Sequence, residues 1–137
     1  MTTALDTVYT ISVWYDGARE GVTSFAGQPH YYVCQLDYDI DGQPTPYLLT
    51  PIDEETFQLE MEHSAIYERY ALALKEERTT ENIYLSLPED RARQEEINQL
   101  LEFTITTLPK SNLTATGKFH YGPTTTVIWT ILAADHQ

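Results

Sequence analysis

The sequence predicts an α+β fold: an antiparallel β-sheet, made of a meander of about four strands plus a C-terminal hairpin, covered on one face by two helices. Three observations lead to this prediction. The first fifty residues alternate β-branched and aromatic runs with Gly and Pro turn signals, which is typical of short strands. Two stretches of helical periodicity follow, each after a capping pattern. Strand chemistry returns from residue 113, and this order favours helices packed on an antiparallel sheet.

Four strands are expected in the N-terminal part. Residues 7–15 (TVYTISVWY) are rich in β-branched and aromatic residues, and residues 22–25 and 47–50 form shorter extended runs. Residues 30–38 alternate in character, so one face of that strand carries His30, Tyr32, Cys34, Leu36 and Tyr38. Turn signals separate the runs at Asp16-Gly17, at Gly27-Gln28-Pro29 and at Asp41-Gly42.

Two helices are expected next. The first is predicted from about Pro51 to Arg78, because TPID at residues 50–53 has the form of a capping box with Pro at the first helical position. Its periodicity predicts burial on two sides. The main stripe holds Leu59, Ile66, Tyr67, Tyr70, Ala73 and Leu74, and a smaller one holds Phe57, Met61 and Leu72.

The second helix is predicted to follow SLPE at residues 86–89, with Ile97, Leu100 and Leu101 on its apolar face. The β-branched run after Phe103 weakens it, and Pro109 closes it. A C-terminal hairpin then turns at Gly122-Pro123, between apolar residues spaced by two. A chain of 137 residues is long enough for one core, so a single domain over residues 1–137 is expected.

Charge limits the class of partner. The chain has 21 acidic and 8 basic residues, a formal net charge of −13. Nucleic-acid binding needs clustered Lys and Arg, and an anionic membrane repels acids, so neither partner is expected. Basic proteins, by contrast, are attracted to such a surface. The lone Cys34 and the absence of an apolar leader or spanning run predict a soluble cytoplasmic protein.

One string has the pattern of a metal site. Asp37, Asp39 and Asp41 precede Gly42 in the D-x-D-x-D-G pattern of a calcium loop. The twelfth position, where that loop needs Glu, is Leu48. Two interpretations stay open: a divergent calcium turn, or an acidic hairpin loop with an Asp-Gly turn. No other cofactor is expected, because the histidines have no zinc-ligand spacing.

No catalytic residue is assigned. Phosphate-loop, dinucleotide and nucleophile-elbow motifs are absent from the sequence, and Cys34 is expected to be a small core residue beside Tyr32. The polar groups that the fold alone does not require are Asp16, Arg19, Glu20 and His30. Because two turns of a meander can lie at the same end of a sheet, Arg19 and His30 could converge over a small-molecule site.

Several segments together suggest a family. The strings YDGAREGV, GQPHYYVC, LTPIDEETF, LPEDRAR and VIWT, in this order, resemble a group of bacterial hypothetical proteins to which no function is assigned. The resemblance covers most of the chain and implies a bacterial source and one intact domain. It supplies neither a catalytic residue nor a ligand. Where the family pattern has Pro in the Asp-Gly-Pro-Arg turn, this chain has Ala18.

Three functional hypotheses follow from the sequence. The favoured one is a non-enzymatic, acidic interaction or regulatory protein, immunity- or inhibitor-like, that binds a basic partner. The second is a small-molecule-binding domain or enzyme with a site near Arg19 and His30. The third is calcium binding at Asp37, Asp39 and Asp41. The absence of a catalytic signature in the sequence favours the first over an enzyme.

Overall fold

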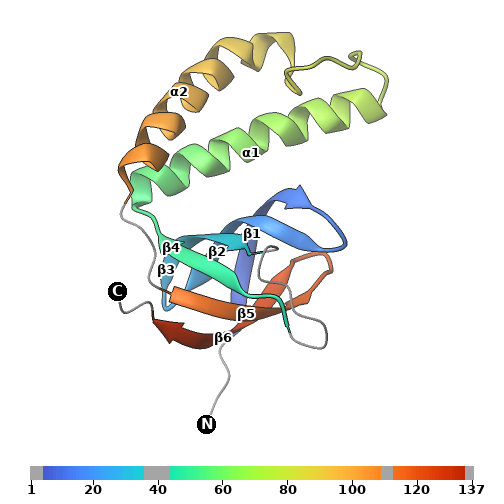
Figure 1. The fold of residues 1–137 in the computed structure, drawn as a ribbon. Helices are drawn as coiled ribbons and strands as arrows, with labels where there is room; N and C mark the ends of the chain where they lie inside the picture. The colour runs from blue at the N-terminus through green and yellow to red at the C-terminus, as the bar shows by residue number, and fades with distance from the viewer. Residues whose placement is uncertain (1–4, 36–43, 109–112, 135–137) are drawn as a thin grey trace. The chain divides into compact units, whose positions relative to one another are not determined.

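The structure, a computed structural model, describes residues 5–35, 44–108 and 113–134. Within these described residues, six strands and two α-helices follow one another in the predicted order (Figure 1). They are β1 (Asp6–Trp14), β2 (Ala18–Phe25), β3 (Gln28–Cys34), β4 (Tyr47–Pro51), α1 (Glu54–Lys75), α2 (Arg91–Thr107), β5 (Leu113–His120) and β6 (Thr126–Ala134). A short 3-10 helix, η2 (Pro88–Asp90), leads into α2. No described helix has the length and apolar character needed to cross a membrane.

The strands form a closed barrel, so the prediction of an open sheet covered on one face by helices is wrong. Each strand pairs antiparallel with the next, and β6 returns to β1 through the pairs Asp6–Val127 and Thr7–Thr126. The backbone amide of Val8 adds a hydrogen bond of 3.0 Å to the carbonyl of Thr125. Closure turns one face of every strand inward, where the barrel's own side chains fill the space that helices were expected to cover.

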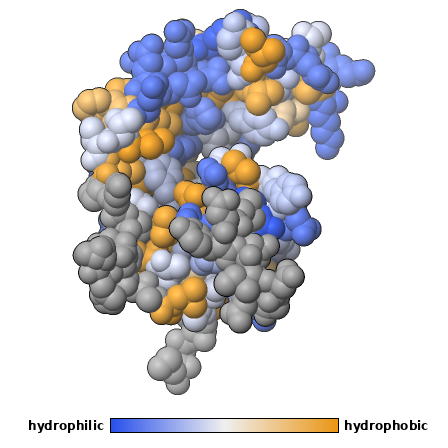
Figure 2. Space-filling model, in the orientation of Figure 1, coloured by the Kyte–Doolittle hydropathy of each residue, from blue (hydrophilic) through white to orange (hydrophobic). Residues whose placement is uncertain are grey.

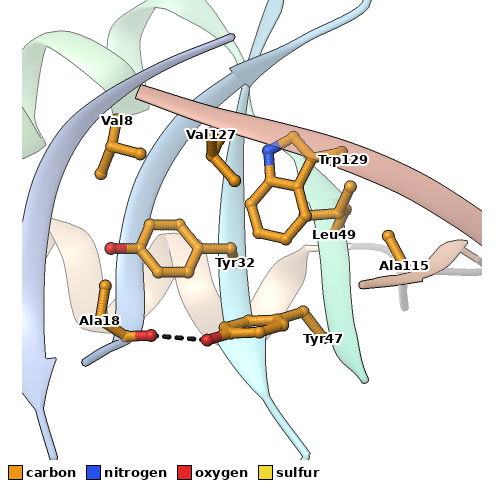
Figure 3. Close-up of a cluster of buried hydrophobic side chains, with 8 residues drawn as sticks. All are labelled: Val8, Ala18, Tyr32, Tyr47, Leu49, Ala115, Val127 and Trp129. Atoms are coloured by element: carbon orange, nitrogen blue, oxygen red, sulfur yellow. Dashed lines mark hydrogen bonds between the residues drawn. The ribbon is translucent and has the colours of Figure 1, made fainter. Parts of the chain in front are cut away.

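The barrel core is aromatic at its centre (Figure 3). The rings of Tyr32, Tyr47, Phe119 and Trp129 all contact one another, with centroid separations from 5.3 to 6.1 Å. Gly117 makes room for this cluster, because a Cβ there would lie 2.6 Å from the Trp129 ring. The remaining buried members are small or aliphatic: Val8, Ala18, Leu49, Ala115 and Val127.

In this cluster the polar atoms of Tyr32, Tyr47 and Trp129 each have a hydrogen-bond partner on β1 or β2. The Tyr32 hydroxyl donates to the carbonyl of Thr10 at 2.9 Å. The Trp129 indole donates to the Thr23 hydroxyl at 3.2 Å. A buried donor left without an acceptor costs roughly 1–3 kcal/mol, so these bonds are a condition for placing tyrosine and tryptophan inside the barrel.

The helices form a second compact unit, residues 54–108, and the barrel residues form the first. Their own small core consists of Leu59, Ile66, Ile97 and Leu101. The expectation of one domain over residues 1–137 stays a prediction. The start of the first helix was placed too early: Pro51 pairs with His30 in the β3–β4 ladder, so α1 begins at Glu54.

The predicted main stripe of α1 is largely buried, but two details differ. Tyr67 of the main stripe and Leu72 of the second stripe are about half exposed, whereas Phe57 and Met61 of the second stripe are partly buried. In addition, α2 continues past Phe103 to Thr107. The threonine hydroxyls there bond back to the helix: those of Thr104 and Thr107 donate to the carbonyls of Leu100 and Thr104 at 2.9 and 3.0 Å. This bonding accommodates β-branched residues in the last turn.

The turn between β2 and β3 lies at Ala26-Gly27, one residue earlier than predicted, because Gln28 and Pro29 already belong to β3. Both turn residues have positive φ, 54° for Ala26 and 76° for Gly27. This is the backbone of a type I′ hairpin, which favours Asn-Gly. Ala26 therefore holds a conformation that an alanine side chain disfavours.

We expect Ala26→Asn to raise the free energy of unfolding by about 1 kcal/mol, because asparagine tolerates the left-handed region. Gly27→Ala should lower it by about the same amount, since the site has open space and only the backbone conformation is penalised. Urea unfolding at constant m-value measures both changes. A loss of stability in Ala26→Asn would contradict the assigned turn.

Candidate functional site

The first candidate region is the turn between β1 and β2. Asp16 and Gly17 have φ values of 55° and 127°, and Arg19 folds back over them. Its Nε donates to the carbonyl of Tyr15 at 2.6 Å, and a terminal nitrogen donates to the carbonyl of Asp16 at 3.2 Å. Arg19 thus closes the turn through backbone carbonyls, and the Asp16 carboxylate is not its acceptor.

The same guanidinium reaches β3 and β4. Its other terminal nitrogen lies 3.6 Å from Cys34 Sγ, and the guanidinium also interacts electrostatically with Tyr47. Burial alone would lower the pKa of Arg19, but the hydrogen bond to Cys34 and the nearby Tyr47 outweigh it, so the pKa is raised. Arg19 stays cationic here. Cys34 packs against the barrel core, as expected, although it is only partly buried.

Ala18, next to Arg19, is held from both sides. Its amide donates to the Tyr121 hydroxyl at 2.8 Å, and its carbonyl accepts from the Tyr47 hydroxyl at 2.7 Å (Figure 3). The Tyr121 ring contacts Trp14 edge-on and stacks on Phe119. No local pattern in the sequence indicates this arrangement, because Tyr121 lies 103 residues from Ala18. A proline at position 18 would have no amide proton to donate to Tyr121.

His30 lies elsewhere. It pairs with Thr23, which is four residues along β2 from Arg19, a separation of about 13 Å in an extended strand. The His30 ring is buried, contacts Phe25 edge-on and has Nδ1 2.9 Å from the carbonyl of Gln28. Glu20 is exposed on β2. The structure therefore brings Asp16 and Arg19 together with Cys34 and Tyr47, and it does not make Arg19 face His30.

The predicted calcium ligands Asp37, Asp39 and Asp41 lie outside the described residues, so calcium binding there stays a prediction. Within the described ranges, no three His, Cys, Asp or Glu side chains are grouped as metal ligands.

The second candidate region is the helical unit. Residues 54–108 carry 13 acidic and 5 basic residues, a formal net charge of −8. Arginines join the two helical segments twice. Arg69 binds Asp90 through two contacts of 3.0 Å, and Arg93 binds Glu62 through two contacts of 2.7 Å. Both pairs have the two-point geometry that suits a guanidinium and a carboxylate.

These pairs use most of the positive charge of the unit. Arg93 also contacts Glu96 at 2.6 Å. The hydrogen bond from Arg93 to Glu62 lowers the pKa of Glu62. Arg78 pairs with Glu76, so three of the five basic residues are engaged. Eight exposed glutamates of this unit have no ion-pair partner in the described part of the chain: Glu54, Glu55, Glu68, Glu77, Glu81, Glu89, Glu95 and Glu102.

Comparison with known proteins adds no assignment. No protein-family model, no curated protein and no solved structure matches the chain.

Tyr47 gives the barrel a dependence on alkaline pH. Burial, with Cys34 nearby, raises the pKa of Tyr47 from 10.0 to about 12, although Arg19 opposes the change. The neutral hydroxyl therefore stabilises the fold fully below pH 10, and this contribution is lost as the pH rises through about 12. We expect the free energy of unfolding, measured in urea, to fall over this range.

Tyr47→Phe should lower stability at neutral pH by about 1 kcal/mol, because the Ala18 carbonyl loses its donor, and should make the alkaline decline shallower. Tyr15→Phe, at an exposed tyrosine, is the matched control and should leave the decline unchanged. An equally steep decline in Tyr47→Phe and the parent protein would contradict the assignment.

Proposed function

We propose that this chain is a non-enzymatic interaction or regulatory protein of the bacterial cytoplasm, immunity- or inhibitor-like, that binds a basic protein through its helical unit. The observation that carries the proposal is the set of eight exposed glutamates without an ion-pair partner among the described residues. Arg69 and Arg93 of the same unit bind other acids, Asp90 and Glu62, and so hold the helical segments together. Most of the exposed glutamates are left without a compensating cation, although Arg69 also attracts Glu89.

Electrostatics supports a basic partner. Uncompensated carboxylates repel one another within the unit, and a surface of Lys or Arg would relieve that repulsion on binding. Complementary charge also speeds the encounter and rejects acidic competitors. Glu95 and Glu102 are seven residues apart on α2, which places them on one face where a single partner can meet both.

The surface of the helical unit also offers apolar contacts. Figure 2 shows hydrophilic residues over most of the helices, with separate hydrophobic patches between them. Exposed apolar residues of α1 and α2 include Tyr67, Leu72, Leu100 and Phe103. Protein interfaces combine an apolar, often aromatic centre with a polar rim, so this mixture supports protein binding.

A helical peptide of Ala and Lys is a suitable test probe, because it offers positive charge with little apolar surface. We expect it to bind at about 0.1 M salt and to lose roughly tenfold in affinity near 1 M, where the screening length falls from about 10 Å to about 3 Å. Calorimetry or fluorescence anisotropy gives the affinity.

The double variant Glu95→Gln and Glu102→Gln should weaken this binding, and Glu20→Gln on β2 is the control that should not. Affinity that does not change with salt, or an equal loss in the Glu20 variant, would contradict a charged docking surface on the helical unit.

A further inference from the structure

The connection between α1 and η2, residues 76–87, exposes three consecutive apolar side chains. Ile83 is 89% exposed, Tyr84 50% and Leu85 49%, and Ile83 is the most exposed large hydrophobic residue of the described chain. Helix–helix connections usually have roughly 2–8 residues, so this one is long, and long ordered loops often have a function. Scattered exposed apolar residues are common, but three in a row at the tip of a hairpin form a patch.

The backbone of this loop is held by Asn82. Its Oδ1 accepts hydrogen bonds from the amides of Tyr84 and Leu85 at 2.9 and 2.8 Å, and its Nδ2 donates to the carbonyl of Ser86 at 3.1 Å. The Asn82 amide donates to the Tyr70 hydroxyl on α1 at 3.2 Å. The side chain and amide of one residue therefore tie the loop to itself and to α1.

Gln94 ties the same loop to α2. It accepts from the hydroxyl of the buried Ser86 at 2.8 Å and donates to the carbonyl of Tyr84 at 2.6 Å. The guanidinium of Arg91 lies 4.1 Å from the centre of the Tyr84 ring. The apolar side chains are thus displayed on a fixed backbone, and a preorganised loop loses little conformational entropy on binding.

Leu85 has a backbone conformation that its side chain disfavours. Its φ of 55° lies in the left-handed region, which a branched side chain disfavours. Backbone strain of this kind persists only where the surroundings enforce it, and it is found preferentially at functional sites. Here the bonds to Asn82 enforce it, and the strained residue belongs to the exposed patch itself.

Charge indicates what the patch contacts. Glu77 and Glu81 precede it and Glu89 follows it, all exposed and without an ion-pair partner in the described part of the chain. Such a border repels an anionic membrane and a second copy of the same acidic chain. It suits an apolar pocket bordered by Lys or Arg.

We propose that Ile83, Tyr84 and Leu85 form the anchor that enters an apolar pocket with a basic border on a protein partner. This inference rests on the proposed function and adds to it the point of docking. In interfaces a few central apolar or aromatic residues supply most of the affinity, and the charged border supplies specificity and speed.

The test compares two helical probe peptides, one of Leu and Lys with its apolar face bordered by ammonium groups, and the Ala and Lys peptide. Ile83→Ser should weaken binding of the Leu and Lys peptide roughly tenfold and leave the Ala and Lys peptide unchanged. Ile105→Ser is the matched control, because Ile105 is an exposed isoleucine on α2, and it should change neither affinity more than about twofold. Asn82→Ala keeps the apolar side chains but removes the hydrogen bonds that hold the loop, so it should also weaken binding of the Leu and Lys peptide.

Other outcomes overturn the anchor. The proposed anchor would be contradicted if Ile83→Ser leaves the affinity for the Leu and Lys peptide unchanged, or if Ile105→Ser lowers that affinity equally. It would also be contradicted if sedimentation shows a dimer that Ile83→Ser dissociates, or if the protein binds phosphatidylglycerol vesicles through Ile83. If the Ala and Lys peptide binds with salt dependence and Ile83 has no effect, only the anchor fails. If neither peptide binds at low salt, the proposed function fails and the anchor with it.

Discussion

Closure of the strand meander is the constraint on which the barrel depends. The rings of Tyr32, Tyr47, Phe119 and Trp129 need an enclosed apolar space, and the two tyrosines and the tryptophan need hydrogen-bond acceptors inside it. Tyr32 and Tyr47 find these acceptors at the carbonyls of Thr10 and Ala18, on β1 and β2. Packing and polar pairing therefore require the same geometry: a barrel that opened between β1 and β6 would expose the rings and disturb the strand that carries one of their acceptors.

The closed barrel also explains why the helical residues can have a separate role. β4 and β5 are neighbours in the barrel, so the 54–108 segment is inserted between two paired strands and leaves the ladder intact. It has its own core and its own arginine–carboxylate pairs. Charge in excess of what the fold uses is concentrated there, and the proposed docking surface and its apolar anchor belong to this unit.

Local patterns in the sequence predicted local structure well. The alternation at His30, Tyr32 and Cys34 and the stripe through Leu59, Ile66 and Tyr70 correspond to buried faces. Barrel closure was missed because the β1–β6 pairing joins residues about 120 positions apart, and no local pattern encodes it.

The hypothesis that Arg19 and His30 converge rests on a geometric argument that does not hold. Successive turns of a meander lie at opposite ends of the strands; Arg19 follows the first turn and His30 the second.

The most direct test of barrel closure replaces residues 54–108 by a short Gly-Ser linker between β4 and β5. The closed barrel predicts a folded protein, with a cooperative urea transition and the near-UV signal of buried Trp129. A product without that transition would show that the barrel cannot close without the helices.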